Sequence, residues 1–97
     1  MKTFEQVLDS KLAECRELMI RKQRDYGSDN ISAWGELGVA VRLTDKVARL
    51  RNLLRPGKVP NNESLRDTAV DIANYGLILM MLLDSEWGAP LEEEVQT

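Results

Sequence analysis

The sequence predicts an all-α protein, and three observations support this class. Three stretches of roughly 20 residues are rich in Leu, Ala, Arg, Glu and Lys, which favour helices. None of them shows sustained alternation of apolar and polar residues, which is the pattern of a half-buried strand. Clusters of Gly, Pro and Asn interrupt the chain at residues 27–30, 55–62 and 88–90, as turns do. We therefore expect long helices over residues 4–24, 34–54 and 63–84.

Length and composition exclude several classes of protein. Ninety-seven residues suffice for one domain, which we place at residues 1–87, followed by an acidic and flexible tail at 88–97. The chain has no His and one Cys, which excludes Ser–His–Asp and Cys–His catalysis, multi-Cys metal sites and an internal disulfide. Its net charge of −3 argues against direct nucleic-acid binding. Any chemistry must therefore rest on carboxylates, Lys, Arg, Tyr and Asn, together with a hard metal ion.

No segment of the chain has the features of a membrane span or a secretory signal. Seven charged side chains interrupt the first twenty residues. The longest apolar run, residues 76–83, is far shorter than the roughly 20 residues that cross a bilayer. We expect a cytoplasmic protein, in the host cytoplasm if a phage encodes it, that does not bind membranes.

The third helical stretch is apolar on almost every side from residue 69 to residue 83. A helix with this pattern is usually buried all round, and two other helices of this length can hardly enclose it. We therefore expect a second copy to complete a four-helix-type bundle, as a dimer or a tetramer. The alternative is a monomer that leaves part of this apolar surface exposed.

Four polar side chains form one stripe on this apolar helix, within roughly 80° of one another on a helical wheel. They are Glu63, Asp67, Asp71 and Asn74. Buried carboxylates need a counter-charge, and the residues allow two solutions. One is a structural ion-pair network with Lys22, Arg42 or Arg49. The other is a Mg²⁺ site, because Mg²⁺ prefers carboxylates together with water and substrate phosphate.

A second polar stripe on the 34–54 stretch favours the metal alternative. It comprises Arg42, Asp45, Arg49 and Asn52. The simplest explanation is a solvated face with an Asp45–Arg49 pair, which contributes only tenths of a kcal/mol. An Asp beside two Arg residues also suits a site that holds a metal and a polyphosphate together. Lys22 could contact phosphate nearby, and Tyr26, Trp34 or Tyr75 could stack on a base.

Three blocks of the sequence resemble the nucleotide-modification-associated domain family, a group of small phage and bacterial proteins. The blocks are residues 22–27 (KQRDYG), 41–50 (VRLTDKVARL) and 62–75 (NESLRDTAVDIANY). The resemblance extends over about residues 15–84. This family is in turn distantly similar to the MazG-like all-α nucleoside triphosphate pyrophosphohydrolases.

The resemblance implies a MazG-like helical bundle that hydrolyses a nucleotide between its α and β phosphates with Mg²⁺. In those enzymes two helices carry the acidic motifs Glu-Glu-x-x-Glu and Glu-x-x-Asp. Asp67 and Asp71 stand at the second motif, with one extra residue between them. Asp45 stands in the first motif, and Arg49 occupies the place of its closing Glu.

Two functional hypotheses follow. The first is a Mg²⁺- or Mn²⁺-dependent nucleoside triphosphate pyrophosphohydrolase, or a nucleotide-binding relative, in phage nucleotide metabolism or modification. Its metal ligands are Asp45, Asp67 and Asp71. Its catalytic residues are Glu63, Asp67 and Asp71. Its phosphate- and substrate-binding residues are Lys22, Tyr26, Arg42, Lys46, Arg49, Asn74 and Tyr75. The second hypothesis is a catalytically inactive helical dimer that binds a nucleotide or a host protein.

Overall fold

A computed structural model describes residues 1–59 and 61–95. Its elements are α1 (Phe4–Tyr26), α2 (Asp29–Ser32), α3 (Gly35–Leu53), α4 (Asn62–Leu83) and a 3-10 turn, η1 (Glu92–Glu94). The described residues contain no strand, which confirms the all-α class. None of these helices combines the length and the apolar character that a membrane crossing requires.

Local capping determines where the long helices begin and end. The Thr3 hydroxyl accepts a hydrogen bond from the Gln6 amide, and the Gln6 side chain accepts one from the Thr3 amide, which is a capping box. At the start of α4, Asn61 Oδ1 accepts from the amides of Glu63 and Ser64. Gly27 ends α1 with a φ of 71°, a conformation that favours glycine.

The prediction that residues 27–30 form only a turn is wrong in part, because α2 begins at Asp29. This helix of four residues is too short for its apolar periodicity to be recognised in the sequence. Pro60, within the predicted turn at 55–62, lies outside the described residues, and so do Gln96 and Thr97 of the predicted tail. Within that tail, Arg24 of α1 forms an ion pair with Glu93 of η1.

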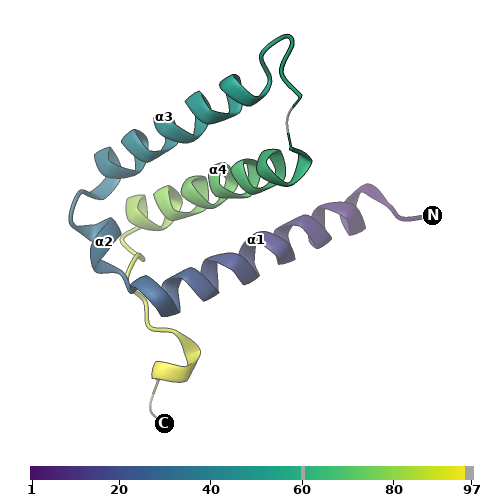
Figure 1. The fold of residues 1–97 in the computed structure, drawn as a ribbon. Helices are drawn as coiled ribbons and strands as arrows, with labels where there is room; N and C mark the ends of the chain where they lie inside the picture. Colours follow the sequence, from purple (N-terminus) through teal and green to yellow (C-terminus); the bar gives the residue numbers. More distant parts are fainter. Residues whose placement is uncertain (60, 96–97) are drawn as a thin grey trace.

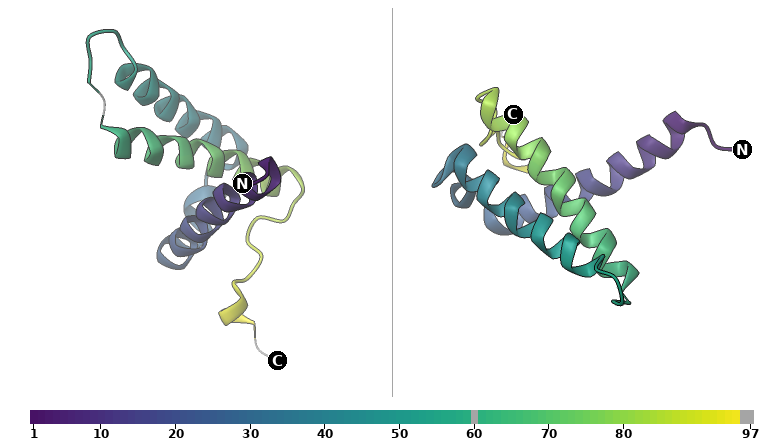
Figure 2. Two further views of the ribbon diagram at one scale, coloured as in Figure 1. Left: turned by 90° about the vertical axis from the view of Figure 1, so that its right-hand side faces the viewer. Right: turned by 90° about the horizontal axis from the view of Figure 1, so that it is seen from above.

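The helices are arranged around α4, which lies between α3 and α1 (Figure 1). Helices α3 and α4 pack along each other as a hairpin, whereas α1 contacts α4 much less extensively. Seen from above, the first half of α1 diverges from the hairpin (Figure 2). One chain therefore does not enclose α4, and Met80 and Leu83 are exposed. A second copy that covers them stays a prediction.

The apolar core gathers where α2 meets the first half of α3 and the second half of α4. Its buried members are Ile31, Val39 and Ile78. Trp87, which follows α4, packs against them, and its Nε1–H donates to the Ser28 carbonyl at 3.0 Å. This contact holds the segment after α4 against the turn between α1 and α2.

Val39 and Val41 offer a matched pair for testing this core, because they lie two residues apart on α3 with exposures of 1% and 56%. Val39→Ala should lower the free energy of unfolding by about 2 kcal/mol, because it loses apolar burial and leaves a cavity. Val41→Ala should change it by less than about 0.5 kcal/mol. Urea unfolding followed by circular dichroism measures both values. Equal losses would contradict this placement of the core.

Candidate functional site

A cavity of about 290 Å³ lies at the junction of α1, α2, α3 and α4. Three aromatic side chains, Tyr26, Tyr75 and Trp87, contribute to its wall. Its charged side chains are Lys22, Arg42 and Asp71, and its amide side chains are Gln23, Asn30 and Asn74. An apolar pocket with a few convergent polar groups is the usual form of a small-molecule site. We call it the aromatic cavity.

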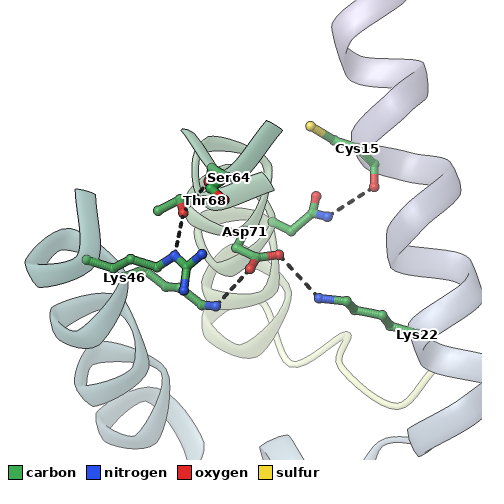
Figure 3. Close-up of polar contacts among 8 residues, drawn as sticks. Cys15, Lys22, Lys46, Ser64, Thr68 and Asp71 are labelled. Atoms are coloured by element: carbon green, nitrogen blue, oxygen red, sulfur yellow. Dashed lines mark hydrogen bonds and ion pairs between the residues drawn. The ribbon is translucent and has the colours of Figure 1, made fainter. Parts of the chain in front are cut away.

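Asp71 of α4 binds one lysine from each neighbouring helix. Its Oδ1 lies 3.2 Å from Lys22 Nζ of α1, and its Oδ2 lies 2.8 Å from Lys46 Nζ of α3 (Figure 3). The Asp71 side chain is only 17% exposed. Burial by itself would raise the pKa of this carboxyl, but hydrogen bonds from Lys46 and Lys22, together with their charges, hold the pKa below its ordinary value. Asp71 is therefore a carboxylate at neutral pH.

A second cavity, of about 300 Å³, lies on the polar face of α3. Its charged lining is Arg42, Asp45, Lys46 and Arg49, so three cations face one carboxylate. The cations follow the i, i+4, i+7 spacing that places side chains on one face of a helix. Arg42 and Tyr75 line both cavities, so the two adjoin. We call this one the cationic cavity.

Uncharged groups hold both arginines of the cationic cavity. Arg42 Nη2 donates to the Asn30 carbonyl at 3.2 Å. Arg49 Nε donates to Thr68 Oγ1 at 3.2 Å, and that buried hydroxyl donates in turn to the Ser64 carbonyl (Figure 3). These contacts orient the guanidinium groups without neutralising them. The charges of Arg42 and Arg49 therefore stay available to an anion.

Asn74 joins α4 to α1 beside the aromatic cavity. Its Nδ2 donates to the Cys15 carbonyl at 3.1 Å, and the residue is 7% exposed. Its Oδ1 is buried and has no hydrogen-bond partner among residues 1–59 and 61–95. A buried acceptor without a hydrogen bond lowers the stability of the folded protein, so this oxygen is a candidate for accepting a hydrogen bond from a ligand N–H or a water.

The structure gathers most of the predicted substrate-binding residues. The aromatic cavity is lined by Lys22, Tyr26, Arg42, Asn74 and Tyr75. The cationic cavity adds Lys46 and Arg49. Of the stacking candidates, Trp34 is exposed and lines neither cavity. Trp87 takes that place. The sequence signal that could have identified it is a Trp directly before the turn at residues 88–90.

The predicted acidic residues are less well gathered. Asp71 lines the aromatic cavity and Asp45 the cationic cavity, but Glu63 and Asp67 are exposed and line neither. One turn of helix rises about 5.4 Å, so residues on one stripe can still lie far apart along the axis. Within the part of the chain that the structure describes, no three acidic or Cys side chains converge as metal ligands would.

Asp71→Asn should test the lysine-bound carboxylate, with Asp67→Asn as a control that removes an exposed carboxylate one turn earlier. At pH 7 we expect Asp71→Asn to lower the free energy of unfolding by roughly 1 kcal/mol, since both ion pairs are partly exposed. The control should change it by less than about 0.5 kcal/mol.

The pH dependence of that loss has a definite sign. Because folding lowers the pKa of Asp71, its ion pairs stabilise fully above the unfolded pKa of about 4. That stability is lost as the pH falls through the lower, folded pKa. Urea unfolding between pH 7 and pH 2 should show wild type and Asp71→Asn converging at the acidic end. A difference that does not change with pH would contradict the ion-pair assignment.

Comparison with known families gives a match. Residues 22–83, nearly two thirds of the chain, match the family model described as nucleotide modification associated domain 1. No curated protein and no solved structure matches the chain, so the similarity to MazG-like enzymes stays a prediction. The matched segment contains every charged residue of the aromatic and cationic cavities. The chain belongs to the nucleotide modification associated domain 1 family.

Proposed function

We propose that this protein binds a nucleotide, with the nucleoside in the aromatic cavity and the phosphates in the cationic cavity. The observation that carries the proposal is the junction of the two cavities at Arg42 and Tyr75. One cavity offers aromatic surface and the other offers an excess of positive charge, which match the two ends of a nucleotide. The family description, which associates the domain with nucleotide modification, supports the same ligand class.

The cationic cavity suits more than one phosphate group. Arg42 and Arg49 are seven residues apart on α3, which corresponds to about 10 Å along the helix axis. Arg groups bind phosphate oxygens in a bidentate manner, and Lys46 adds a point charge between them. A nucleoside diphosphate or triphosphate can contact more of these groups at once than a monophosphate can.

Asp71 sets the electrostatic balance between the two cavities. In the free protein its carboxylate occupies the ammonium groups of Lys22 and Lys46. A phosphate entering this region competes with Asp71 for the same two lysines. Arg42 and Arg49, which no carboxylate neutralises among the described residues, then provide the first contacts.

Mg²⁺- or Mn²⁺-dependent hydrolysis of the nucleotide is a second proposal. It is supported by Asp45 and Asp71, which border adjoining cavities. The described residues of one chain do not fit a preassembled metal site, because both oxygens of Asp71 contact ammonium groups and no third carboxylate joins them. Nucleotide binding is therefore the main proposal. A catalytically inactive binding protein is the alternative to a hydrolase.

Thermal unfolding with a panel of nucleosides, monophosphates and triphosphates tests the binding proposal. A triphosphate at 100 times its dissociation constant should stabilise the protein by about 2.7 kcal/mol and raise the Tm by roughly 10 °C. Arg42→Ala should weaken triphosphate binding at least about tenfold, while Arg51→Ala, which removes an exposed charge outside both cavities, should not. No shift with any nucleotide would overturn the proposal.

Asp71→Asn separates binding from hydrolysis. The substitution releases two lysines to the phosphates, so nucleotide affinity should stay equal or increase. If Asp71 is needed for hydrolysis, release of nucleoside monophosphate and pyrophosphate with Mg²⁺ or Mn²⁺ should fall by at least about a hundredfold. If wild type binds nucleotides tightly but forms no product from any of them, hydrolysis is excluded and the protein is a catalytically inactive binding protein.

A further inference from the structure

The first half of α1 has an apolar face that no other described part of the chain covers. Its apolar side chains, Phe4, Val7, Leu8 and Leu12, are all exposed, with Leu8 at 45%. This half projects away from the α3–α4 hairpin (Figure 2). We call residues 4–12 the arm.

An apolar groove of about 330 Å³ lies between the second half of α1 and the end of α4. Its floor includes Met19, Ile20, Leu77 and Met80. Its charged lining is Arg16, Asp84 and Glu86, so the two carboxylates leave the groove with an excess of negative charge. This groove is distinct from the two cavities of the proposed site, because it shares only Met19 with the aromatic cavity and nothing with the cationic cavity.

The arm cannot fill the groove of its own chain. The arm and the α1 wall of the groove are parts of one continuous helix from Phe4 to Tyr26, so the helix fixes the distance between them. Any occupant of the groove that resembles the arm must come from another molecule. A second copy carries both the arm and the groove, so reciprocal docking satisfies all four surfaces and closes the assembly as a twofold dimer.

The dimensions of the chain agree with a missing partner. Its radius of gyration is 15.6 Å, against about 12.5 Å for a compact chain of this length. Its accessible surface is 7603 Å², against about 5,600 Å² for a compact monomer of 11.0 kDa. The difference, about 2,000 Å², exceeds the roughly 800 Å² per partner that a standard stable interface buries.

The charges of the arm and the groove also favour the arm of a second copy as the occupant of the groove. Lys11 falls on the apolar side of the arm, between Val7 and Phe4 on a helical wheel, and forms no ion pair with any residue that the structure describes. Docking the apolar side of the arm would carry this ammonium group into the contact, where it needs an acidic partner. The groove supplies that charge, because Asp84 and Glu86 outnumber its one cation, Arg16.

We infer that the arm of one chain docks in the groove of a second copy, and the arm of the second copy docks in the groove of the first. The contact buries Leu8 and its apolar neighbours against Met80 and places Lys11 beside Asp84 and Glu86. Each protomer thereby covers part of the α4 surface that its own helices leave exposed.

Sedimentation and thermal unfolding of the full chain test this inference. Wild type should sediment at twice its chain mass of 11.0 kDa, with a Tm that rises with concentration. Leu8→Glu in the arm and Met80→Glu in the groove should each raise the dissociation constant roughly 30-fold or more, the size of a hot-spot loss. Leu37→Glu, at a more exposed leucine on α3, should have no effect.

A mixture of the two variants identifies the docking mode. A heterodimer of Leu8→Glu and Met80→Glu chains retains one intact arm in one intact groove, so mixing should restore part of the dimer that neither variant forms alone. Circular dichroism should show both variants fully helical, because Leu8 and Met80 are exposed within one chain. The inference would be overturned if wild type stays monomeric at a concentration of about 100 μM. It would also be overturned if either variant still forms the dimer, or if mixing the two variants restores no dimer.

Discussion

The carboxylate of Asp71 constrains how α1 and α3 are placed against α4. Asp71 lies on the most apolar helix of the chain, where burial opposes its charge, and it is stabilised by one lysine from α1 and one from α3. Removing either lysine would leave a partly buried charge with half of its partners. The ion pairs therefore fix both neighbouring helices to α4 at the same level, and the aromatic cavity forms at this level.

The electrostatics of the candidate site follow from how its cations are held. Lys22 and Lys46 are balanced by Asp71, whereas Arg42 and Arg49 are oriented by a carbonyl and a hydroxyl. Uncharged partners do not neutralise the arginine side chains, and they restrict the motion of those side chains. The protein as a whole is acidic, with a net charge of −3, so this local excess of positive charge is not a consequence of composition. This preorganised cationic surface on an acidic protein supports the proposal of a small anionic ligand.

The sequence predicts the long helices and the helix faces that form the site, but not which residues on those faces lie at the same level along the helix axes. Apolar periodicity places α1, α3 and α4 within two residues of their ends, because those helices are long and well capped. A helical wheel also puts Asp71 and Arg42 on the two polar stripes, and both side chains line the aromatic cavity. The wheel contains no axial distances, so it groups Glu63 and Asp67 with Asp71 although they line neither cavity. It also cannot show that Trp87 returns to the turn after α1, because that contact depends on tertiary packing.

Helix α1 connects the candidate site to the proposed assembly. One end of this helix supplies Lys22 and Tyr26 to the aromatic cavity, and the other end is the arm. Within one chain α1 is held to α4 by few groups: the Lys22–Asp71 and Glu14–Arg66 ion pairs and the hydrogen bond from Asn74 to Cys15 are the main polar ones. Docking of the arm in a second copy would fix both ends of a stiff helix instead of one. The angle between α1 and α4, and with it the width of the aromatic cavity, would then depend on the dimer, which links nucleotide affinity to association.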